Sequence, residues 1–316
     1  MSRRRSDYDV TDTIRTTDPA AVAAEIRRIY RDSYRRPDWQ PIEHSFRDVT
    51  LLYAGANPRY RACDTSYHDL QHVMEVTLAM ARLMHGYQRA GREPLDARLF
   101  ALGIVLALYH DCGYVRHRND SRHANGAEYT LTHVSRGARY LRKYLPHIGM
   151  ADLAPVAAKV IHFTGYEIPV SRIRVKEPVH RVLGNLLGSA DILGQMADRC
   201  YLEKCHDRLF PEFEAGGIAR RRRPDGQIEI VFESAGDLIA KTPDFYETAA
   251  QRLDAQLDAA YRYIEPHFGG QNHYVSAVEQ NIQYARKLAG TPDKPRRLRR
   301  RPPNVVAAAQ GQLQFN

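Results

Sequence analysis

The sequence is poor in cysteine and contains no long apolar run. Its four cysteines show neither the paired spacing of a zinc ribbon nor the density of a disulfide-rich domain, so we expect reduced thiols. The longest apolar run, Leu99 to Tyr109, is far shorter than the roughly 20 residues that span a bilayer. No apolar stretch follows the basic residues after Met1, which argues against a secretory signal. We therefore expect a soluble, cytoplasmic protein without a transmembrane segment.

The net positive charge is concentrated at the two ends of the chain, and the body between them is nearly neutral. The net charge of +9 comes mostly from Arg3 to Arg5 and from the arginine-rich end of the chain. Segments of this composition bury little apolar surface, so residues 1–17 and 291–316 are predicted to be disordered basic ends. The tail is a candidate for weak, salt-sensitive contact with nucleic acid or an anionic surface. No internal repeat or linker interrupts residues 18–290, which we expect to form one domain.

Apolar residues recur at helical spacing through most of this body. Asp18 followed by Pro19 is a typical helix start, and Thr242 followed by Pro243 predicts another. The segment 101–109 is apolar on every side, which indicates a central helix surrounded by others. One stretch differs, because a Pro-Asp-Gly turn precedes alternating apolar residues near 219–233. The predicted fold is an all-α helical bundle with a small β-hairpin near 219–233.

Two short segments place histidine and carboxylate at metal-ligand spacing. His68 and His72 are four residues apart, so on a helix their Cβ atoms lie about 5–6 Å apart on one face. His110 and Asp111 end the apolar segment, where buried polar groups need partners to offset desolvation. Asp191 sits in another apolar helical segment and has the same requirement. A metal ion would satisfy all of these groups.

In this order and with these long separations, the residues resemble the HD-domain superfamily of metal-dependent phosphohydrolases. The resemblance covers residues 67–204 and implies that 18–290 form an HD/PDEase-like helical domain. The segment Tyr67-His68-Asp69-x-x-His72 is also similar to the Tyr-His-Asn-x-x-His segment of cyclic-nucleotide phosphodiesterases, which makes His68 the general acid. The resemblance assigns the metal ligands to His72, His110, Asp111 and Asp191.

Further positions extend the resemblance less completely. Glu128 lies in a segment similar to the Asn-Glu-Glu-x-Ser segment of bacterial members, which implies a catalytic role at a metal-bound water, and it equally suits the first turn of a helix. His133 and His162 follow in the order of second-metal ligands, although core histidines would explain both. Arg61 and Gln195 lie near the motifs and are candidate substrate contacts.

The expected reaction is hydrolysis of a small phosphorylated substrate, such as a nucleotide, with one or two divalent ions. A mixed nitrogen and oxygen ligand set suits Mn, Fe, Co, Zn or Mg. Mammalian-type phosphodiesterases have histidine and asparagine where this chain has Tyr114 and Asp69, so cyclic nucleotides are not the expected substrates. Two alternatives stay open: an HD-type di-iron oxygenase that also uses His133 and His162, and a non-catalytic nucleotide- or RNA-binding protein that uses its basic ends.

Overall fold

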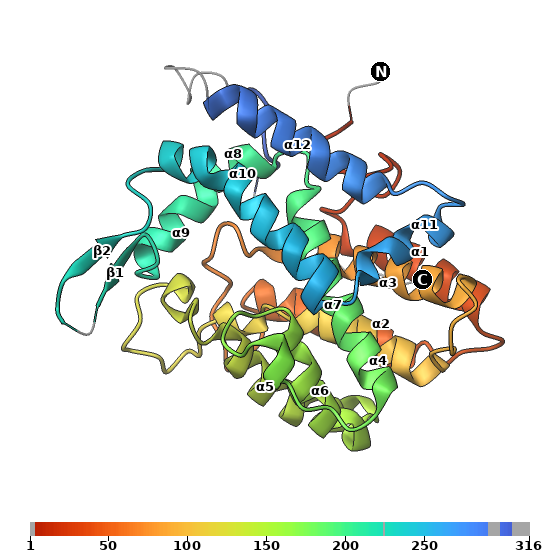
Figure 1. Ribbon diagram of the computed structural model, residues 1–316. Coiled ribbons are helices and arrows are strands. Elements are labelled where there is room, and N and C mark those ends of the chain that lie inside the picture. The colour runs from red at the N-terminus through yellow and green to blue at the C-terminus, as the bar shows by residue number, and fades with distance from the viewer. Residues whose placement is uncertain (1–3, 224, 290–297, 305–316) are drawn as a thin grey trace.

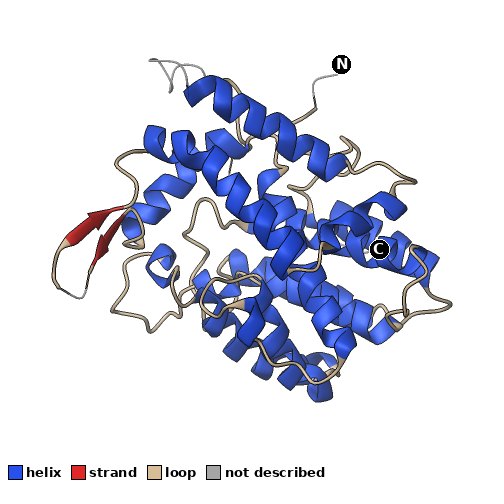
Figure 2. Ribbon diagram, viewed as in Figure 1, coloured by secondary structure: helices blue, strands red, loops and turns tan. Residues whose placement is uncertain are grey.

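The computed structural model describes residues 4–223, 225–289 and 298–304 and is mostly helical (Figures 1 and 2). The predicted all-α fold with one small hairpin is confirmed. The helices are α1 (Pro19–Ser33), α2 (Gln40–Tyr53), α3 (Leu70–Arg89), α4 (Ala97–Tyr109), α5 (His133–Tyr144), α6 (Ala154–Val160), α7 (Pro178–Met196), α8 (Tyr201–Lys204), α9 (Phe210–Ala215), α10 (Ala235–Gln251), α11 (Ile264–His267) and α12 (His273–Ala289). The strands are β1 (Arg220–Arg222) and β2 (Ile228–Ile230).

Helix α3 is the centre of the bundle and packs against α1, α4, α7 and α11. Its side chains are buried on almost every side, and so is the apolar second half of α4. Helix α7 approaches α3 closely because Gly194 has no side chain; a Cβ there would lie 2.9 Å from Val76 Cγ2. This close packing brings the polar residues of α3, α4 and α7 into one interior region.

The hairpin projects from the bundle at the left of Figure 1. Strands β1 and β2 pair antiparallel, with Arg220 opposite Ile230 and Arg222 opposite Ile228. The side chains of both isoleucines are largely exposed. The hairpin therefore contributes little to the core, as expected for an insertion between helices.

Helix α10 begins earlier than the Thr242-Pro243 signal predicted. It starts at Ala235, where the Ser234 side chain accepts a hydrogen bond of 3.2 Å from Asp237 N, and Pro243 lies inside the helix. Proline lacks an N–H and cannot make the helical bond to the residue four positions earlier. The serine cap with an acidic residue three positions later is the true start signal, and the predicted start was wrong.

The N-terminal segment packs against the bundle from Arg4 onward, although residues 1–17 were predicted to be a disordered basic end. Tyr8 and Arg15 form a β-bridge around a tight loop, and the buried Asp9 carboxylate accepts from the amides of Thr13 and Ile14. Asp9 Oδ2 also accepts at 2.6 Å from Arg82 Nη2 on α3. Burial opposes ionisation of Asp9, but Arg82, the Ile14 amide and the Thr11 hydroxyl outweigh it and lower the pKa of the carboxyl. The ion pair anchors the segment.

Part of the basic tail, residues 298–304, also lies against the body. Arg300 N donates to Glu203 Oε1 at 3.1 Å, and its guanidinium donates to Asn281 Oδ1 at 2.7 Å. This stretch differs from the predicted disordered tail because buried polar groups of α8 and α12 provide partners. Residues 290–297 and 305–316 lie outside the described residues.

The sequence analysis expected reduced cysteines and no transmembrane segment. All four cysteines are free thiols. Within the described part of the chain, no helix combines the length and apolar character needed to cross a bilayer.

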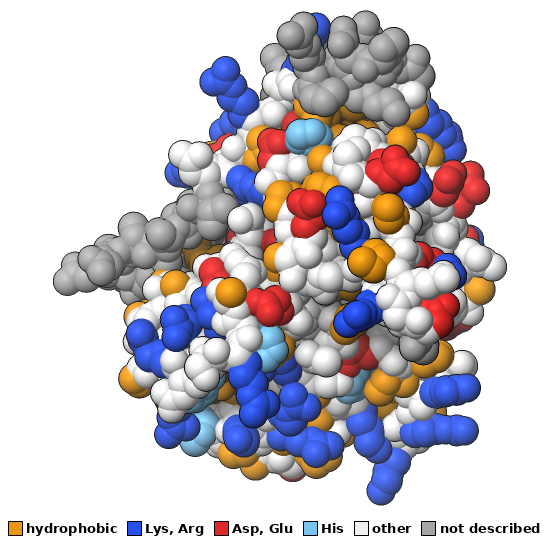
Figure 3. Space-filling model, turned by 90° about the vertical axis from the view of Figure 1, so that its left-hand side faces the viewer, with side chains coloured by type: hydrophobic (Ala, Val, Ile, Leu, Met, Phe, Trp, Pro, Cys, Tyr) orange, Lys and Arg blue, Asp and Glu red, His pale blue; other side chains and the backbone are white. Residues whose placement is uncertain are grey.

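On the face drawn in Figure 3, Lys and Arg side chains gather over the lower part, at the level of α5 and α6 in Figure 1.

Candidate metal centre

Three helices, α3, α4 and α7, converge on one buried point. His72 lies in the first turn of α3, which begins where the Asp69 carboxylate accepts from His72 N at 2.9 Å. His110 caps the end of α4 and is followed directly by Asp111. Asp191 comes from α7. The aspartate at position 69 is thus a helix cap, a position that asparagine fills equally well.

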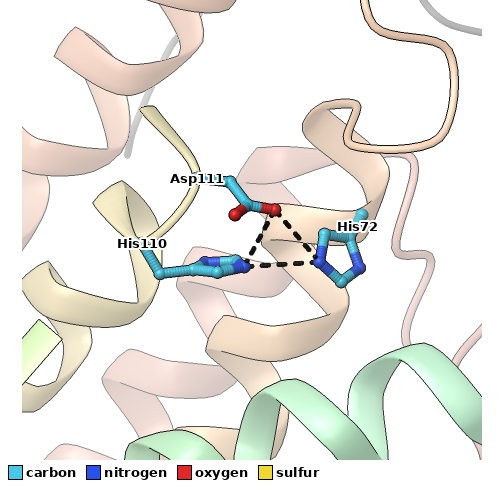
Figure 4. A group of neighbouring side chains, drawn as sticks. All are labelled: His72, His110 and Asp111. Carbon is cyan, nitrogen blue, oxygen red and sulfur yellow. Dashed lines mark hydrogen bonds and ion pairs between the residues drawn. The ribbon is translucent and has the colours of Figure 1, made fainter. Parts of the chain in front are cut away.

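The tightest group consists of His72, His110 and Asp111 (Figure 4). The Nε2 atoms of the two histidines lie 3.3 Å apart. Asp111 Oδ2 lies 3.4 Å from His72 Nε2 and 3.2 Å from His110 Nε2, yet it has no hydrogen bond and is buried. A buried carboxylate oxygen facing two imidazole nitrogens is a group that could hold a metal ion.

Asp191 and His133 complete the cluster. Asp191 Oδ1 lies 3.6 Å from His72 Nε2 and 3.7 Å from His110 Nε2. On the other side of Asp111, His133 Nε2 lies 3.5 Å from Oδ1. The structure therefore brings together five of the six residues that the sequence analysis named as metal ligands.

Hydrogen bonds orient two of the imidazole rings. His110 Nδ1 lies 2.7 Å from Ala107 O, and His133 Nδ1 lies 2.7 Å from Thr130 O. A carbonyl oxygen only accepts, so each Nδ1 carries the proton. In the neutral rings the Nε2 lone pairs then point toward Asp111. A backbone partner on the outer nitrogen is a common way to orient metal-ligating histidines.

The electrostatics of the cluster favour a positive charge at its centre. Burial opposes protonation of His110, but the carboxylates of Asp111 and Asp191 outweigh it and raise its pKa to about 9. Burial likewise opposes ionisation of Asp111, but the neighbouring imidazoles hold the pKa of the carboxyl well below its usual range. For His133 burial dominates and lowers the pKa, so its imidazole is neutral near pH 7. A bound cation would balance the negative charge of the two carboxylates, as a proton on His110 does.

His68 lies beside the cluster and is paired with a residue that the sequence analysis missed. Its Nδ1 lies 2.6 Å from Oε2 of Glu212 on α9, whose other oxygen accepts from Tyr67 N. Burial opposes protonation of His68, but the Glu212 carboxylate outweighs it and raises the pKa. The His68 ring stacks on Tyr114 at 4.4 Å, and Tyr114 stacks on His133 at 4.3 Å. The tyrosine thus links the general-acid candidate to the cluster.

Three predicted residues do not join the cluster. Glu128 is exposed and forms a capping box, in which Oε1 accepts from Ala124 N at 2.6 Å and Asn125 N at 3.0 Å. His162 makes no ion pair with the central carboxylates, and its Nδ1 is buried without a hydrogen bond. Arg61 is exposed and donates to Arg118 O at 3.1 Å. The helix-start interpretation of Glu128 therefore holds, and its predicted catalytic role has no support in this position.

Gln195 is half-buried on α7, four residues after Asp191 and thus on the same face of the helix. Within the described residues, the Gln195 side chain forms no hydrogen bond. Its predicted role in substrate binding stays a prediction.

Comparison with known proteins assigned the chain to one family. Neither the curated proteins nor the solved structures gave a match. A family model described as Npun_R2479-like matches residues 21–286, which covers nearly the whole bundle and every residue of the cluster. This description states no activity. The chain belongs to the Npun_R2479-like family.

Proposed function

We propose that this protein is a metal-dependent phosphohydrolase. The observation that carries the proposal is Asp111 Oδ2, a buried carboxylate oxygen without a hydrogen bond that faces His72 Nε2 and His110 Nε2. This oxygen lies within ion-pair distance of both imidazoles, but a buried acceptor without a hydrogen bond costs about 1–3 kcal/mol, and more when it is charged. A divalent cation among these atoms would remove that cost.

The donor set fits one or two divalent ions. His72, His110, Asp111 and Asp191 would hold one ion, and His133 at the second oxygen of Asp111 would help to hold another. Nitrogen and carboxylate ligands together suit Mn, Fe, Co, Zn or Mg. Exposure differs across the set, since the Asp191 side chain is 22% exposed and that of His110 only 1%. A substrate would therefore approach from the side of Asp191.

Bound in this set, a divalent ion supplies Lewis acidity to a phosphoryl oxygen and lowers the pKa of a water. The protein itself contributes the proton for the leaving oxygen. Glu212 accepts from His68 Nδ1 and stabilises the protonated ring, so the Nε2–H is available for donation. Tyr114 supports the ring from one face through stacking. The substrate class that suits this arrangement is a small phosphomonoester or phosphodiester, for example a nucleotide.

A di-iron oxygenase is the second candidate, because His133 beside Asp111 Oδ1 offers the additional ligand that a two-iron site needs. With an imidazole at each oxygen of Asp111, these residues would hold two ions in either enzyme class. Iron at two per chain, together with oxygen consumption, would identify the oxygenase. The His68–Glu212 pair favours the hydrolase, since proton donation to a leaving group is the role for which a raised pKa is suited.

The test is hydrolysis of p-nitrophenyl phosphate and bis-p-nitrophenyl phosphate by the full chain, with each candidate metal added to metal-free protein. We expect metal-dependent release of p-nitrophenol that is lost in His72→Ala. The matched control is His44→Ala, a histidine on α2 outside the cluster, which should keep full activity. Metal binding without hydrolysis of either ester, combined with oxygen uptake by the iron-loaded protein, would overturn the hydrolase in favour of the oxygenase.

A further inference from the structure

A second concave site lies away from the metal-ligand cluster. It is a groove with a volume of about 840 Å³. It lies between the end of α2, the loop 56–60, the segment 112–117 and the outer face of α5. None of the cluster residues His72, His110, Asp111 or Asp191 lines it. We refer to it as the α5 groove. Its volume lies in the range of ligand-binding sites, and nothing in the proposed function uses it.

The rim of the α5 groove is strongly cationic. Arg139, Arg142 and Lys143 are exposed along α5, and Arg59 is exposed on the loop 56–60. These side chains form no ion pair within the described part of the chain. A rim of this kind creates a positive potential that favours a ligand with several negative charges.

The acidic residue among the lining side chains is Asp48, and its carboxylate is already engaged. It accepts at 3.1 Å from Tyr144 Oη and at 3.0 Å from Arg47 Nε. It therefore offsets little of the charge along α5. The groove therefore keeps a positive potential that can attract an anionic ligand.

The floor of the groove is aromatic. The Tyr60 ring lies 5.3 Å from His117 and 5.8 Å from Tyr140, and Tyr140 lies 5.8 Å from Tyr144 (centroid distances). All four rings line the groove. Rings in a row beneath a cationic rim are the combination that proteins use to bind nucleobases by stacking while they contact the phosphates.

The cations are held on a rigid frame. Helix α5 buries Val134, Ala138 and Leu141 on its inner side, which turns its basic residues outward. Arg136 fixes the helix by donating to Gly113 O at 2.7 Å and to Val115 O at 3.1 Å. Because this arginine is engaged with the backbone, it is a structural residue and we do not count it as a ligand contact.

The opposite wall is fixed by backbone pairing. Tyr60 and His117 form a β-bridge, with Arg61 N donating to Arg116 O at 2.9 Å and Arg118 N to Arg59 O at 2.8 Å. Both walls are therefore organised before any ligand arrives, which lowers the entropy cost of binding.

We propose that the α5 groove binds single-stranded nucleic acid. Charge complementarity favours a phosphate backbone along Arg139, Arg142 and Lys143, and the recessed rings require bases that are free to leave a stack. A duplex keeps its bases inside and presents phosphates alone, so it would use the rim without the floor. The inference is independent of the phosphohydrolase proposal, because it needs neither metal nor turnover.

The experiment measures fluorescence anisotropy of a labelled 12-nucleotide oligouridylate against the full chain, with EDTA present, at several salt concentrations. The groove variant loses three cations, and a matched variant loses three exposed cations outside the groove. Circular dichroism melts verify that both are folded. The two variants are Arg139→Ala/Arg142→Ala/Lys143→Ala and Arg31→Ala/Arg35→Ala/Arg92→Ala.

We expect the groove variant to bind weakly and to lower the slope of log K against log salt by about 2, because each phosphate contact on a single strand contributes about 0.7. The matched variant should change the affinity less than about twofold. Equal losses in both variants would overturn the proposal, since they would indicate binding to net charge alone.

Tyr60 tests the aromatic floor separately. Tyr60→Ala should weaken binding of the oligonucleotide about tenfold with an unchanged salt slope, whereas Tyr60→Phe should bind like the wild type. An oligouridylate affinity that is insensitive to Tyr60→Ala would contradict base stacking in the groove. Saturation by a nucleoside triphosphate without measurable binding of the oligonucleotide would overturn the single-strand assignment in favour of a free nucleotide.

The basic tail provides the last control. The tail variant replaces three cations that lie outside the described residues: Lys294→Ala/Arg296→Ala/Arg297→Ala. We expect it to retain most of the affinity of the wild type. Loss of binding in the tail variant, with normal binding in the groove variant, would overturn the proposal and move the site to the tail.

Discussion

The short segment Asp111–Val115 joins the metal-ligand cluster to the α5 groove. The two regions differ in how their charged groups are placed. In the cluster, two carboxylates and three imidazoles face one another in the interior. In the groove, the cations of α5 are exposed and form no ion pair within the described chain. Buried charges require partners at defined positions, whereas exposed charges act through a screened potential. A single substitution in the cluster should therefore have a large effect on activity. In the groove each lost cation should have a small effect on binding, and that effect should depend on salt.

The largest expected effect is at the residue that the whole cluster faces. Asp111→Ala should reduce phosphoester hydrolysis to the background rate, because the carboxylate that would hold the ions is removed. Binding of oligouridylate by the same variant should match the wild type, since the groove keeps its cations and rings. Parallel loss of both activities in a folded Asp111→Ala protein would break the separation between the two regions.

The next effect concerns proton donation. His68→Ala should lower kcat by about 10²–10⁴, the usual contribution of a general acid, while metal content stays that of the wild type. Steady-state kinetics with elemental analysis of the same preparation provide both numbers. An unchanged kcat would remove His68 from the mechanism and leave its pairing with Glu212 as a structural contact.

Gly113 tests the junction between the two regions. A Cβ at this position would lie 1.8 Å from His133 O, so Gly113→Ala should force α5 away from the segment that follows Asp111 and destabilise the fold by about 1–3 kcal/mol. Gly236→Ala is the matched control on α10, where the nearest atom to a new Cβ is 3.6 Å away. Equal midpoints in urea unfolding for Gly113→Ala and the wild type would contradict the close contact.

A smaller effect is expected from Glu212→Gln. The Glu212 carboxylate raises the pKa of His68 despite the opposing effect of burial, so His68 stays protonated to higher pH. Without that charge the pKa of His68 falls, and the alkaline limb of the kcat profile should move to lower pH. We expect roughly a tenfold loss near pH 8, comparable to the loss of an orienting partner elsewhere. A profile with the position of the wild type would show that Glu212 does not set the proton donor.

The smallest effect is expected at Glu128, which caps a short helix. Glu128→Ala should cost about 0.5–2 kcal/mol of stability through the lost cap and leave kcat unchanged. Thermal melts and steady-state kinetics measure the two effects. A large fall in kcat at constant stability would restore the catalytic role that the sequence resemblance implied for this residue.

The residues of the cluster could be predicted because the signals are local. His72 follows a helix cap at Asp69, and His110 and Asp111 end a segment that is apolar on every side. Such patterns predict both the element and the burial of its last residues. The roles of Glu128 and Arg61 were inferred from resemblance or proximity in sequence, and the structure places both side chains on the surface.

The remaining features depend on contacts between distant parts of the chain. Glu212 meets His68 across more than 140 positions, and Asp9 meets Arg82 across more than 70. No local pattern around Glu212 or Asp9 indicates the partner, so the ordered N-terminal segment was missed. The α5 groove was equally hidden, because only folding brings the cations of α5 beside the rings of Tyr60 and His117.

The most direct test of the central claim is metal stoichiometry. Full-length protein would be stripped of metal, loaded with Mn, Fe, Co, Zn or Mg in turn, freed of excess ion and analysed for elemental content beside Asp111→Asn. We predict one or two divalent ions per wild-type chain and a loss of at least one in the variant. No retained ion in the wild type with any of the five metals, or equal retention in both proteins, would contradict a metal site at Asp111.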